Sequence, residues 1–462
     1  MPEIADPIDQ DSADRAYATL PALNGYAQTF SVFVGEPVHV RIARKPSRDL
    51  RGHGHKARGP IHVSRIKIRN VVTGKFVATV RPAARTQIFE QQPASFKDEG
   101  AGYDCLIAID TAALAPGLHE CVVTDSTAHV SKEIYFNLKP RALAGYDIVC
   151  VLPTFTWQAY NRVGGGSFYN NTKGPELSIS LHRPLSKKRD NFVDAAIPFL
   201  QTFEQERIRW ACIDSSDLHF GRLPSGKAPV LALLTHDEYW SQAMRDRIDR
   251  YLDARGVVLV AAGNVCWWRV EVDGSNVTVR KKNGQEGLWA HNHLPEETTF
   301  VSSFRFGGYP IDVAQKMPRL AKRVANLTPA QIAASRAMTV IAPEHPLFNG
   351  VALDKDHAFG GDVPIMYREI DGIPIRKDGK LWRKRYGRNR IAPKILATGI
   401  VIRGYRGSSR ARKVGVVVEA QVRHGHVLHL GTFGWSLGLS KKNKDVRQIL
   451  LNAYRYCRAL AK

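Results

Sequence analysis

The sequence lacks the features that mark membrane, secreted and disulfide-bonded proteins. No apolar run in its 462 residues is long enough to span a bilayer. Residues 1–10 are acidic and contain no apolar segment of the kind that a secretory signal needs. The six cysteines are widely spaced and form no CxxC pair, which argues against a zinc ribbon or a redox motif. Reduced thiols are typical of the cytoplasm, so we expect a cytoplasmic protein.

Acidic residues are too few to balance the basic ones. The chain has 66 Lys and Arg against 43 Asp and Glu, a formal net charge of +23. Such an excess often indicates nucleic acid or an acidic membrane surface as a partner. Here the basic residues form separate runs at 48–58, 377–390 and 403–413, all rich in Gly or Ser. We interpret them as solvated loops and expect neither a membrane nor a nucleic-acid partner; an acidic partner chain or loose polyanion binding is the alternative.

The first third of the chain has the pattern of an all-β domain. Residues 1–27 show no periodicity and are predicted to form a flexible arm. Over 28–142, short apolar and β-branched segments alternate with Gly and Pro, which predicts an Ig-like antiparallel β-sandwich. The predicted strands are 29–34, 38–42, 61–68, 76–80, 105–109, 119–124 and 129–138.

From residue 143 to 462 the pattern changes to alternating strands and helices. Short connections between them predict a doubly wound sheet of parallel strands. The predicted strands are 146–152, 208–213, 229–234, 256–262, 339–342, 395–401, 414–419 and 426–430, and the helices 190–206, 241–254 and 445–461. Residues 270–300 are polar and are predicted to be irregular. The fold class is therefore multidomain, an all-β part followed by an α/β part.

The segment Thr235-His236-Asp237-Glu238-Tyr239-Trp240 directly follows a predicted strand. Ligands bind beyond the carboxyl ends of strands in open α/β sheets, because loops there meet in a crevice. A histidine, a carboxylate and a phenol at such a position can bind a metal ion or transfer protons. The alternative is structural, with polar side chains that cap the following helix and aromatic rings that pack in the core.

Other predicted strands end in chemically active side chains as well. Tyr160 lies in a segment rich in amide and aromatic groups, before Gly164-Gly165-Gly166, which match neither a P-loop nor GxGxxG. Asn264 follows the strand that neighbours the one before His236. Cys266 could be an exposed nucleophile at a strand-to-helix elbow, although a buried, inert thiol is the commoner case. Glu369 could transfer protons, with a surface acid as its alternative.

Several of these motifs together resemble the large subunit of N,N-dimethylformamidase. They are Thr156-Trp157-Gln158-Ala159-Tyr160-Asn161 with Gly164-Gly165, then His236-Asp237-Glu238-Tyr239-Trp240-Ser241, then Gly263-Asn264 with Trp268-Arg269. The resemblance covers most of residues 145–462 and, more loosely, the β-sandwich. It implies a class I glutamine-amidotransferase-like α/β domain and a mononuclear iron held by two tyrosines and a carboxylate.

The resemblance also assigns residues to the metal. Tyr160 and Glu238 would be two of the three ligands. The family's other tyrosine is matched here by His119, in Leu114-Ala115-Pro116-Gly117-Leu118-His119. The implied set is then His119, Tyr160 and Glu238. One phenolate fewer stabilises Fe(III) less, and imidazole also suits Zn(II) and Fe(II), although Fe(III) is favoured.

The expected function is hydrolysis of a carbon–nitrogen bond in a small amide by metal-activated water. The resemblance implies that His236 or Glu369 delivers a proton to the leaving amine and that Asn264 orients substrate or water. It also implies a small companion subunit, with a homo-oligomer as the alternative. Two other classes stay open: a cysteine amidohydrolase with Cys266 as nucleophile and His236 as base, and a non-catalytic protein that binds polyanions or carbohydrate.

Overall fold

The computed structural model describes residues 20–45, 61–82, 86–91, 97–164, 166–169, 176–185, 192–281, 287–354, 357–376, 380–386, 391–402, 411–412 and 414–461. The basic run at 48–58 lies outside these residues, and so do large parts of the runs at 377–390 and 403–413. The protein is a mixed α/β structure with several sheets, and the largest of them is rich in parallel strands. Among the described residues, no helix is both long and apolar enough to cross a membrane.

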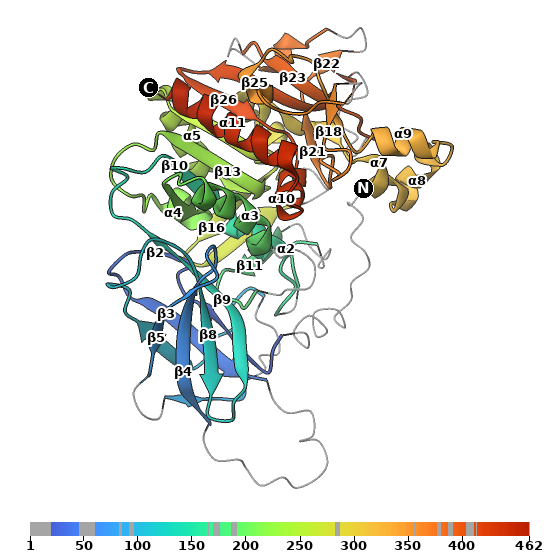
Figure 1. Cartoon of the computed structure of the whole chain (residues 1–462). Helices are drawn as coiled ribbons and strands as arrows, with labels where there is room; N and C mark the ends of the chain where they lie inside the picture. The colour runs from blue at the N-terminus through green and yellow to red at the C-terminus, as the bar shows by residue number, and fades with distance from the viewer. Residues whose placement is uncertain are drawn as a thin grey trace.

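Residues 23–139 form two sheets that enclose one apolar core (Figure 1). The smaller sheet has the order β1(Leu23–Ala27)-β3(Val38–Arg44)-β7(Cys105–Ile109), and the larger has the order β2(Ser31–Phe33)-β9(Val130–Lys139)-β8(Gly117–Asp125)-β4(Ile61–Asn70)-β5(Phe76–Val80), with β6(Gln87–Ile88) paired to β4. Each predicted strand of this part is present. The structure differs at β1, which lies in the segment predicted as an arm. Its Leu23 is fully buried and pairs with Arg44, a long-range partner that local periodicity does not reveal.

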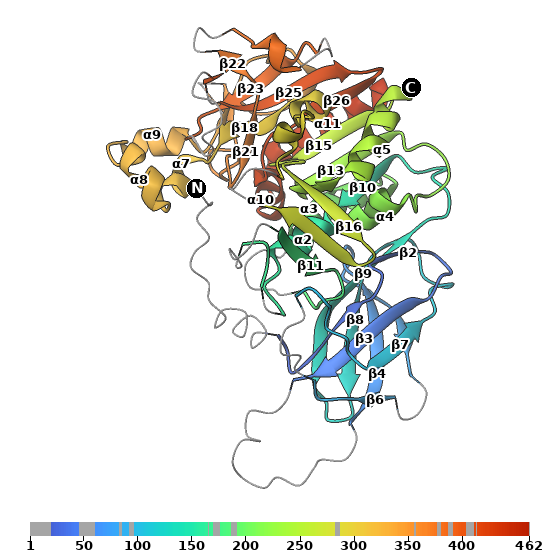
Figure 2. The same cartoon turned by 180° about the vertical axis from the view of Figure 1, so that it is seen from behind.

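The central sheet has nine strands, all of which come from the part of the chain after residue 139 (Figures 1 and 2). Five strands are parallel, in the order β12(Trp210–Asp214)-β10(Ile148–Leu152)-β13(Val230–His236)-β15(Val257–Gly263)-β26(Gly425–His429). Four more follow antiparallel, β25(Gly415–Val422)-β23(Lys394–Gly399)-β19(Met338–Val340)-β20(Ala358–Phe359). The prediction of a parallel sheet was therefore wrong for the four strands β25, β23, β19 and β20, which are antiparallel. Only two residues connect β25 to β26, and so short a connection permits an antiparallel pair only.

Helices cover both faces of the parallel half (Figures 1 and 2). α3(Phe192–Gln205) and α11(Lys444–Leu460) share an apolar cluster with alternate strand residues such as Ala232 and Leu259. α5(Gln242–Asp253) packs on the other face, against the intervening residues such as Leu233 and Val258. Burial on both faces explains why these strands are almost continuously apolar. The remaining α/β elements that matter for the site are α2(Thr154–Tyr160), α4(Ser215–Phe220) and α10(Gly434–Ser440).

Residues 270–300 are not irregular as predicted. β16(Trp268–Asp273) and β17(Asn276–Arg280) form a hairpin in a four-stranded sheet of order β11(Glu176–Ser180)-β17-β16-β14(Tyr239–Ser241). Apolar residues alternate along both hairpin strands, but the frequent polar residues obscured this period of two. The other short elements are η3(Trp289–Asn292), α6(Glu297–Phe300), β18(Ser303–Gly308), α7(Ile311–Gln315), α8(Pro318–Val324), α9(Pro329–Ala334), η4(Pro346–Phe348), β21(Ile370–Gly372), β22(Ile375–Arg376), η5(Arg383–Tyr386) and β24(Ala411–Arg412).

Gly263, the last residue of β15, gives a stability prediction. A Cβ atom at this position would lie 2.2 Å from the backbone oxygen of Glu369. We expect Gly263→Ala to lower the free energy of unfolding by about 1–3 kcal/mol, because the backbone would have to shift in a packed region. Urea unfolding followed by circular dichroism measures this. Gly361→Ala is the matched control, since the nearest atom there lies 3.5 Å away; equal losses in both variants would contradict the prediction.

Candidate functional site

The site lies at the carboxyl edge of the central sheet, where β10, β13 and β15 end side by side. Tyr160 closes α2, the helix that follows β10, and Glu238 lies two residues beyond β13. The Tyr160 hydroxyl donates to Glu238 Oε2 at 2.7 Å. The Thr156 hydroxyl accepts from the backbone N–H of Glu238 at 2.9 Å, so α2 and the segment after β13 are held to each other. The structure thus brings together the phenol and the carboxylate that the sequence singled out.

Tyr169 joins this pair and was missed by sequence reasoning. Its hydroxyl oxygen lies 2.8 Å from Tyr160 Oη, and 3.0 and 2.8 Å from Glu238 Oε1 and Oε2. The backbone N–H of Phe168 donates to Ala159 O at 2.9 Å, which returns the glycine-containing loop to α2. The available signal was a second tyrosine nine residues after Tyr160, beyond a glycine run that permits the chain to turn back. Tyr160, Tyr169 and Glu238 together are called the oxygen cluster below.

Lys281 brings positive charge to the oxygen cluster. The Tyr239 hydroxyl donates to the Tyr169 oxygen at 2.8 Å, and Lys281 Nζ donates to the Tyr239 oxygen at 3.0 Å. The same ammonium lies 4.1 Å from the centre of the Tyr169 ring and 4.5 Å from that of Trp268. A cation over a phenol ring favours negative charge on that phenol. This residue ends the β16–β17 hairpin, in the region that was expected to be irregular.

His236, Glu369 and Asn264, which the sequence placed at the site, form a second group beside the oxygen cluster. His236 Nε2 lies 2.9 Å from Glu369 Oε2 and 3.6 Å from Glu238 Oε2. The Asn264 amide donates to Glu369 Oε2 at 3.2 Å. His236 therefore bridges two carboxylates, one in each group, which is suitable for moving a proton between them.

Burial and charge act in opposite directions at this group. Burial lowers the pKa of His236, but the carboxylates of Glu369 and Glu238 outweigh it, and the pKa is raised overall. Burial raises the pKa of Glu369, yet the His236 imidazole outweighs it and the pKa is lowered. The pKa of Tyr160 is raised well above its usual value. Burial is the larger cause, and the negative charge of Glu238 is the second. Tyr160 therefore keeps its proton unless a strong positive charge binds beside it.

Asp371 holds Asn264 in an uncommon conformation. Asn264 has a φ of 54°, in the left-handed region. Its backbone N–H donates to Asp371 Oδ1 at 2.9 Å, and that of Val265 donates to Oδ2 at 3.4 Å. His429 Nε2 lies 3.1 Å from the same carboxylate, and all of these groups are buried. Of the two neighbouring acids, Glu369 therefore contacts the side chains of His236 and Asn264, and Asp371 holds the backbone of the loop at Asn264.

His119 does not join the oxygen cluster. Its side chain lies in the core between the two sheets of residues 23–139, stacked on Phe136 with ring centres 5.3 Å apart. His119 Nδ1 lies 2.9 Å from Gly117 O, which satisfies one of its nitrogens. Burial lowers the pKa of His119, as expected for a neutral core histidine. Its assignment as a metal ligand stays a prediction that these contacts do not favour.

Cys266 has the properties of an inert thiol. It is fully buried. Burial raises the pKa of the thiol well above its usual value, so almost no thiolate, the nucleophilic form, exists near neutral pH. The geometry therefore disfavours the cysteine-hydrolase alternative.

The donor types in the described part of the chain limit what could hold a metal. Within it, no three His, Cys, Asp or Glu side chains gather in an arrangement that could bind a metal ion. A metal at this site would need phenolate oxygen, and the oxygen cluster has two phenols and one carboxylate. Such hard oxygen donors suit Fe(III) among biological metals.

Comparison with solved structures gives no usable guide to the fold. The chain is similar to a superoxide reductase (neelaredoxin) from Ignicoccus hospitalis at 14% identity, over 30% of this chain and 98% of the reductase, with a TM-score of 0.16. A single-residue variant of that reductase is similar at 12% identity, over 30% of this chain and 99% of the other, also with a TM-score of 0.16. No curated protein matches the chain.

The family comparison is informative. Residues 61–447 match the family described as N,N-dimethylformamidase beta subunit-like, C-terminal. The match includes the oxygen cluster, His236, Asn264 and Glu369, and it confirms the resemblance seen in the sequence motifs. The chain therefore belongs to the N,N-dimethylformamidase beta subunit-like family.

Proposed function

We propose that this protein is a metal-dependent hydrolase of the carbon–nitrogen bond of a small amide. The observation that carries the proposal is the convergence of Tyr160, Tyr169 and Glu238, whose oxygens lie within 3.0 Å of one another. The family's name refers to an enzyme that acts on N,N-dimethylformamide, which is a small amide. The resemblance implies an iron held by two tyrosines and a carboxylate, and the oxygen cluster has that composition.

The residues present fit a trivalent metal ion. Two phenols and a carboxylate would supply up to three negative charges when the phenols lose their protons. The Tyr160 phenol needs a nearby positive charge to ionise, because burial and Glu238 raise its pKa. Lys281 lies over the Tyr169 ring and would offset part of the added negative charge. When bound, the iron would make hydroxide available from water near neutral pH and would polarise the amide carbonyl.

His236 and Glu369 would handle the protons of the reaction. Expulsion of an amine requires a proton on its nitrogen, because the unprotonated amide anion is a poor leaving group. The His236 imidazole faces both Glu238 and Glu369, so it can take a proton on the side of the oxygen cluster and pass it on through Glu369. Asn264 holds the Glu369 carboxylate in place by its amide hydrogen bond. The burial of these groups excludes bulk water and strengthens their electrostatic effects.

The family name also bears on assembly. A beta subunit is by its name one part of a larger enzyme. We infer that the chain works with a companion subunit, for which its net charge of +23 suggests an acidic partner. Size-exclusion chromatography with light scattering on the protein from its native source would show the added mass.

Metal analysis tests the proposal. We expect about one iron per chain in the purified protein, with a visible absorption band from phenolate-to-Fe(III) charge transfer. Removal of iron by a chelator should abolish both the band and the hydrolysis of N,N-dimethylformamide, and added iron should restore both. A metal-free protein that keeps full amidase activity would overturn the proposal.

The cysteine mechanism has its own test. We expect Cys266→Ser to change kcat by less than about threefold, because the thiol is buried and keeps its proton. Steady-state assays of amide hydrolysis measure this, with Cys457→Ser as a control at a second fully buried thiol. A loss of activity of a thousandfold or more in the Cys266 variant alone would instead identify Cys266 as the nucleophile.

A further inference from the structure

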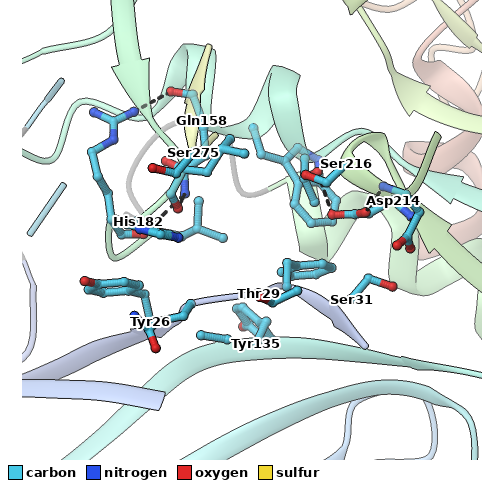
Figure 3. A pocket seen from close by; sticks show the side chains of 18 of the residues that line it. Tyr26, Thr29, Ser31, Tyr135, Gln158, His182, Asp214, Ser216 and Ser275 are labelled. Atoms are coloured by element: carbon cyan, nitrogen blue, oxygen red, sulfur yellow. Dashed lines mark hydrogen bonds between the residues drawn. The ribbon is translucent and has the colours of Figure 1, made fainter. Parts of the chain in front are cut away.

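A cavity lies between the strands of residues 23–139 and the helices at the carboxyl edge of the central sheet. Figure 3 shows it from close by. Its volume is about 320 Å³, which is enough for a small organic molecule. The segment from β1 to β2 and strand β9 line one side; α2, α4 and the turn between β16 and β17 line the other.

This cavity is separate from the oxygen cluster, and α2 divides the two. Thr154, Trp157 and Gln158 line the cavity. Thr156 and Tyr160 of the same helix instead contact Glu238. Tyr160, Tyr169 and Glu238 do not line the cavity. A ligand here would therefore occupy a site that amide hydrolysis does not use.

Aromatic rings make up much of the cavity wall. The rings lie on β1, on β9, on α2, on α4 and in the connections between them: Tyr26, Phe30, Tyr135, Trp157, His182 and Phe220. Phe30 and Trp157 meet edge to face at 5.6 Å. Ring faces carry negative electrostatic potential and attract organic cations, quaternary ammonium groups above all.

One end of the cavity has a carboxyl group, that of Asp214, which forms no ion pair with any described residue. Figure 3 places Asp214 and Ser216 at this end. Asp217 and Arg222 also line the cavity, and each has its own ion-pair partner: Lys139 for Asp217 and Glu36 for Arg222. Asp214 is almost fully buried, and among the described residues its oxygens accept hydrogen bonds only from the backbone N–H of Asp217 at 2.8 Å and the Thr154 hydroxyl at 3.0 Å. Burial, and next the Asp217 carboxylate, raise the pKa of Asp214 to about 8. This carboxyl therefore keeps its proton near neutral pH until a positive charge beside it favours the carboxylate.

The opposite end has a different character. Gln158 and His182 lie there in Figure 3. The buried Arg183 also lines the cavity, and it donates to the backbone oxygens of Ser180, Val163, Gly166 and Gln158. Its donors are therefore largely engaged by the protein. Burial lowers the pKa of His182, which favours the neutral ring.

We propose that this cavity binds a small organic ammonium ion. The cationic group lies toward Asp214 among the aromatic rings. The proposal does not depend on the amidase activity, and its test measures binding alone.

Choline and its uncharged isostere, the same molecule with carbon in place of nitrogen, are the probes. Both have the hydroxyl and the same shape, so they differ only in charge. We expect titration calorimetry on the full chain to show choline binding at least about tenfold more tightly than the isostere. Equal affinity for the two probes, or no binding of choline at millimolar concentration, would overturn the proposal.

Three substitutions locate the binding site. Asp214→Asn removes the carboxyl that would ionise beside a bound cation and keeps the helix N-cap, because Asn caps as well as Asp; choline affinity should fall about tenfold while that of the isostere is unchanged. Ser216→Trp should fill the cavity and abolish binding of both probes. Asp110→Asn, at an exposed turn, is the control and should bind both normally.

Glu238→Gln separates this site from the catalytic groups. It should retain choline binding in full, since Glu238 does not line the cavity. Circular dichroism and thermal unfolding establish that each variant is folded. Loss of choline binding in Glu238→Gln together with normal binding in Asp214→Asn and Ser216→Trp would place the cation at the catalytic cluster and overturn the proposal.

Discussion

Glu238→Gln is expected to lower kcat/KM for a small amide by about a thousandfold or more and to leave the purified protein with little iron. The carboxylate is the shared partner of both phenols, at 2.7 Å from Tyr160 and 2.8 Å from Tyr169. Glutamine keeps the shape and some of the hydrogen bonds but removes the negative charge. Metal-ion catalysis contributes several kcal/mol to the stabilisation of the transition state, and each 1.4 kcal/mol is about a tenfold change in rate.

Glu369→Gln is the matched control for that experiment. It changes the same chemical group, on the other side of His236. We expect it to keep the iron and the visible band, and to lower kcat by about 10²–10⁴-fold through the loss of proton transfer. The pair of variants separates metal binding from proton transfer. Equal iron content in the wild type and in Glu238→Gln would contradict the assignment of Glu238 as a ligand.

The strand-end residues were the part of the site that the sequence could predict. Glu238 and Asn264 follow apolar runs that can only be buried strands, and parallel neighbours put their carboxyl ends at one edge. Tyr160 belongs to the same edge because it ends the helix after β10. The position of these residues follows from one rule, that neighbouring parallel strands end at the same edge of a sheet. Contacts between distant parts of the chain did not have to be known.

The other parts depend on how distant segments meet. Tyr169 reaches Glu238 only because a glycine-containing loop folds back on α2, a path that no periodicity encodes. Lys281 arrives on a hairpin whose polar residues concealed its alternation. The antiparallel half of the central sheet follows from a two-residue turn after β25, which the pattern of apolar runs does not show. His119 was predicted as a ligand because it matches the family's other tyrosine at the start of a strand. A shift of one residue in that match would move the side chain to the opposite face of the sheet.

The resemblance to an amidotransferase-like domain and the bounds 1–27, 28–142 and 143–462 stay predictions. The structure has two sheets in residues 23–139 and a nine-stranded mixed sheet after them. The cavity that contains Trp157 and Asp214 lies between these two parts, so its residues come from both. A site of this kind cannot be predicted from either segment alone, because its shape depends on how the parts pack.

The identity of the third ligand is decided by comparing Tyr169→Phe with His119→Phe. The structure places the Tyr169 oxygen 2.8 Å from Tyr160 Oη and Glu238 Oε2, whereas His119 stacks on Phe136 in a separate core. We expect Tyr169→Phe to weaken iron retention by at least about tenfold. Loss of a residue that only hydrogen-bonds to a metal ligand typically lowers metal affinity by about 10–100-fold, and a charged ligand itself contributes more. The charge-transfer band should weaken and shift, since one of two phenolates is gone.

His119→Phe should leave both the iron content and the visible band unchanged. It keeps an aromatic ring against Phe136 and loses only the contact with Gly117 O, so the expected cost is about 0.5–1.5 kcal/mol in the free energy of unfolding. Tyr239→Phe, which removes the hydroxyl next to Tyr169 without touching Glu238, is a further control that should retain iron. Iron lost from His119→Phe and kept in Tyr169→Phe would instead support the ligand set that the sequence suggested, and would require the two parts of the chain to pack differently.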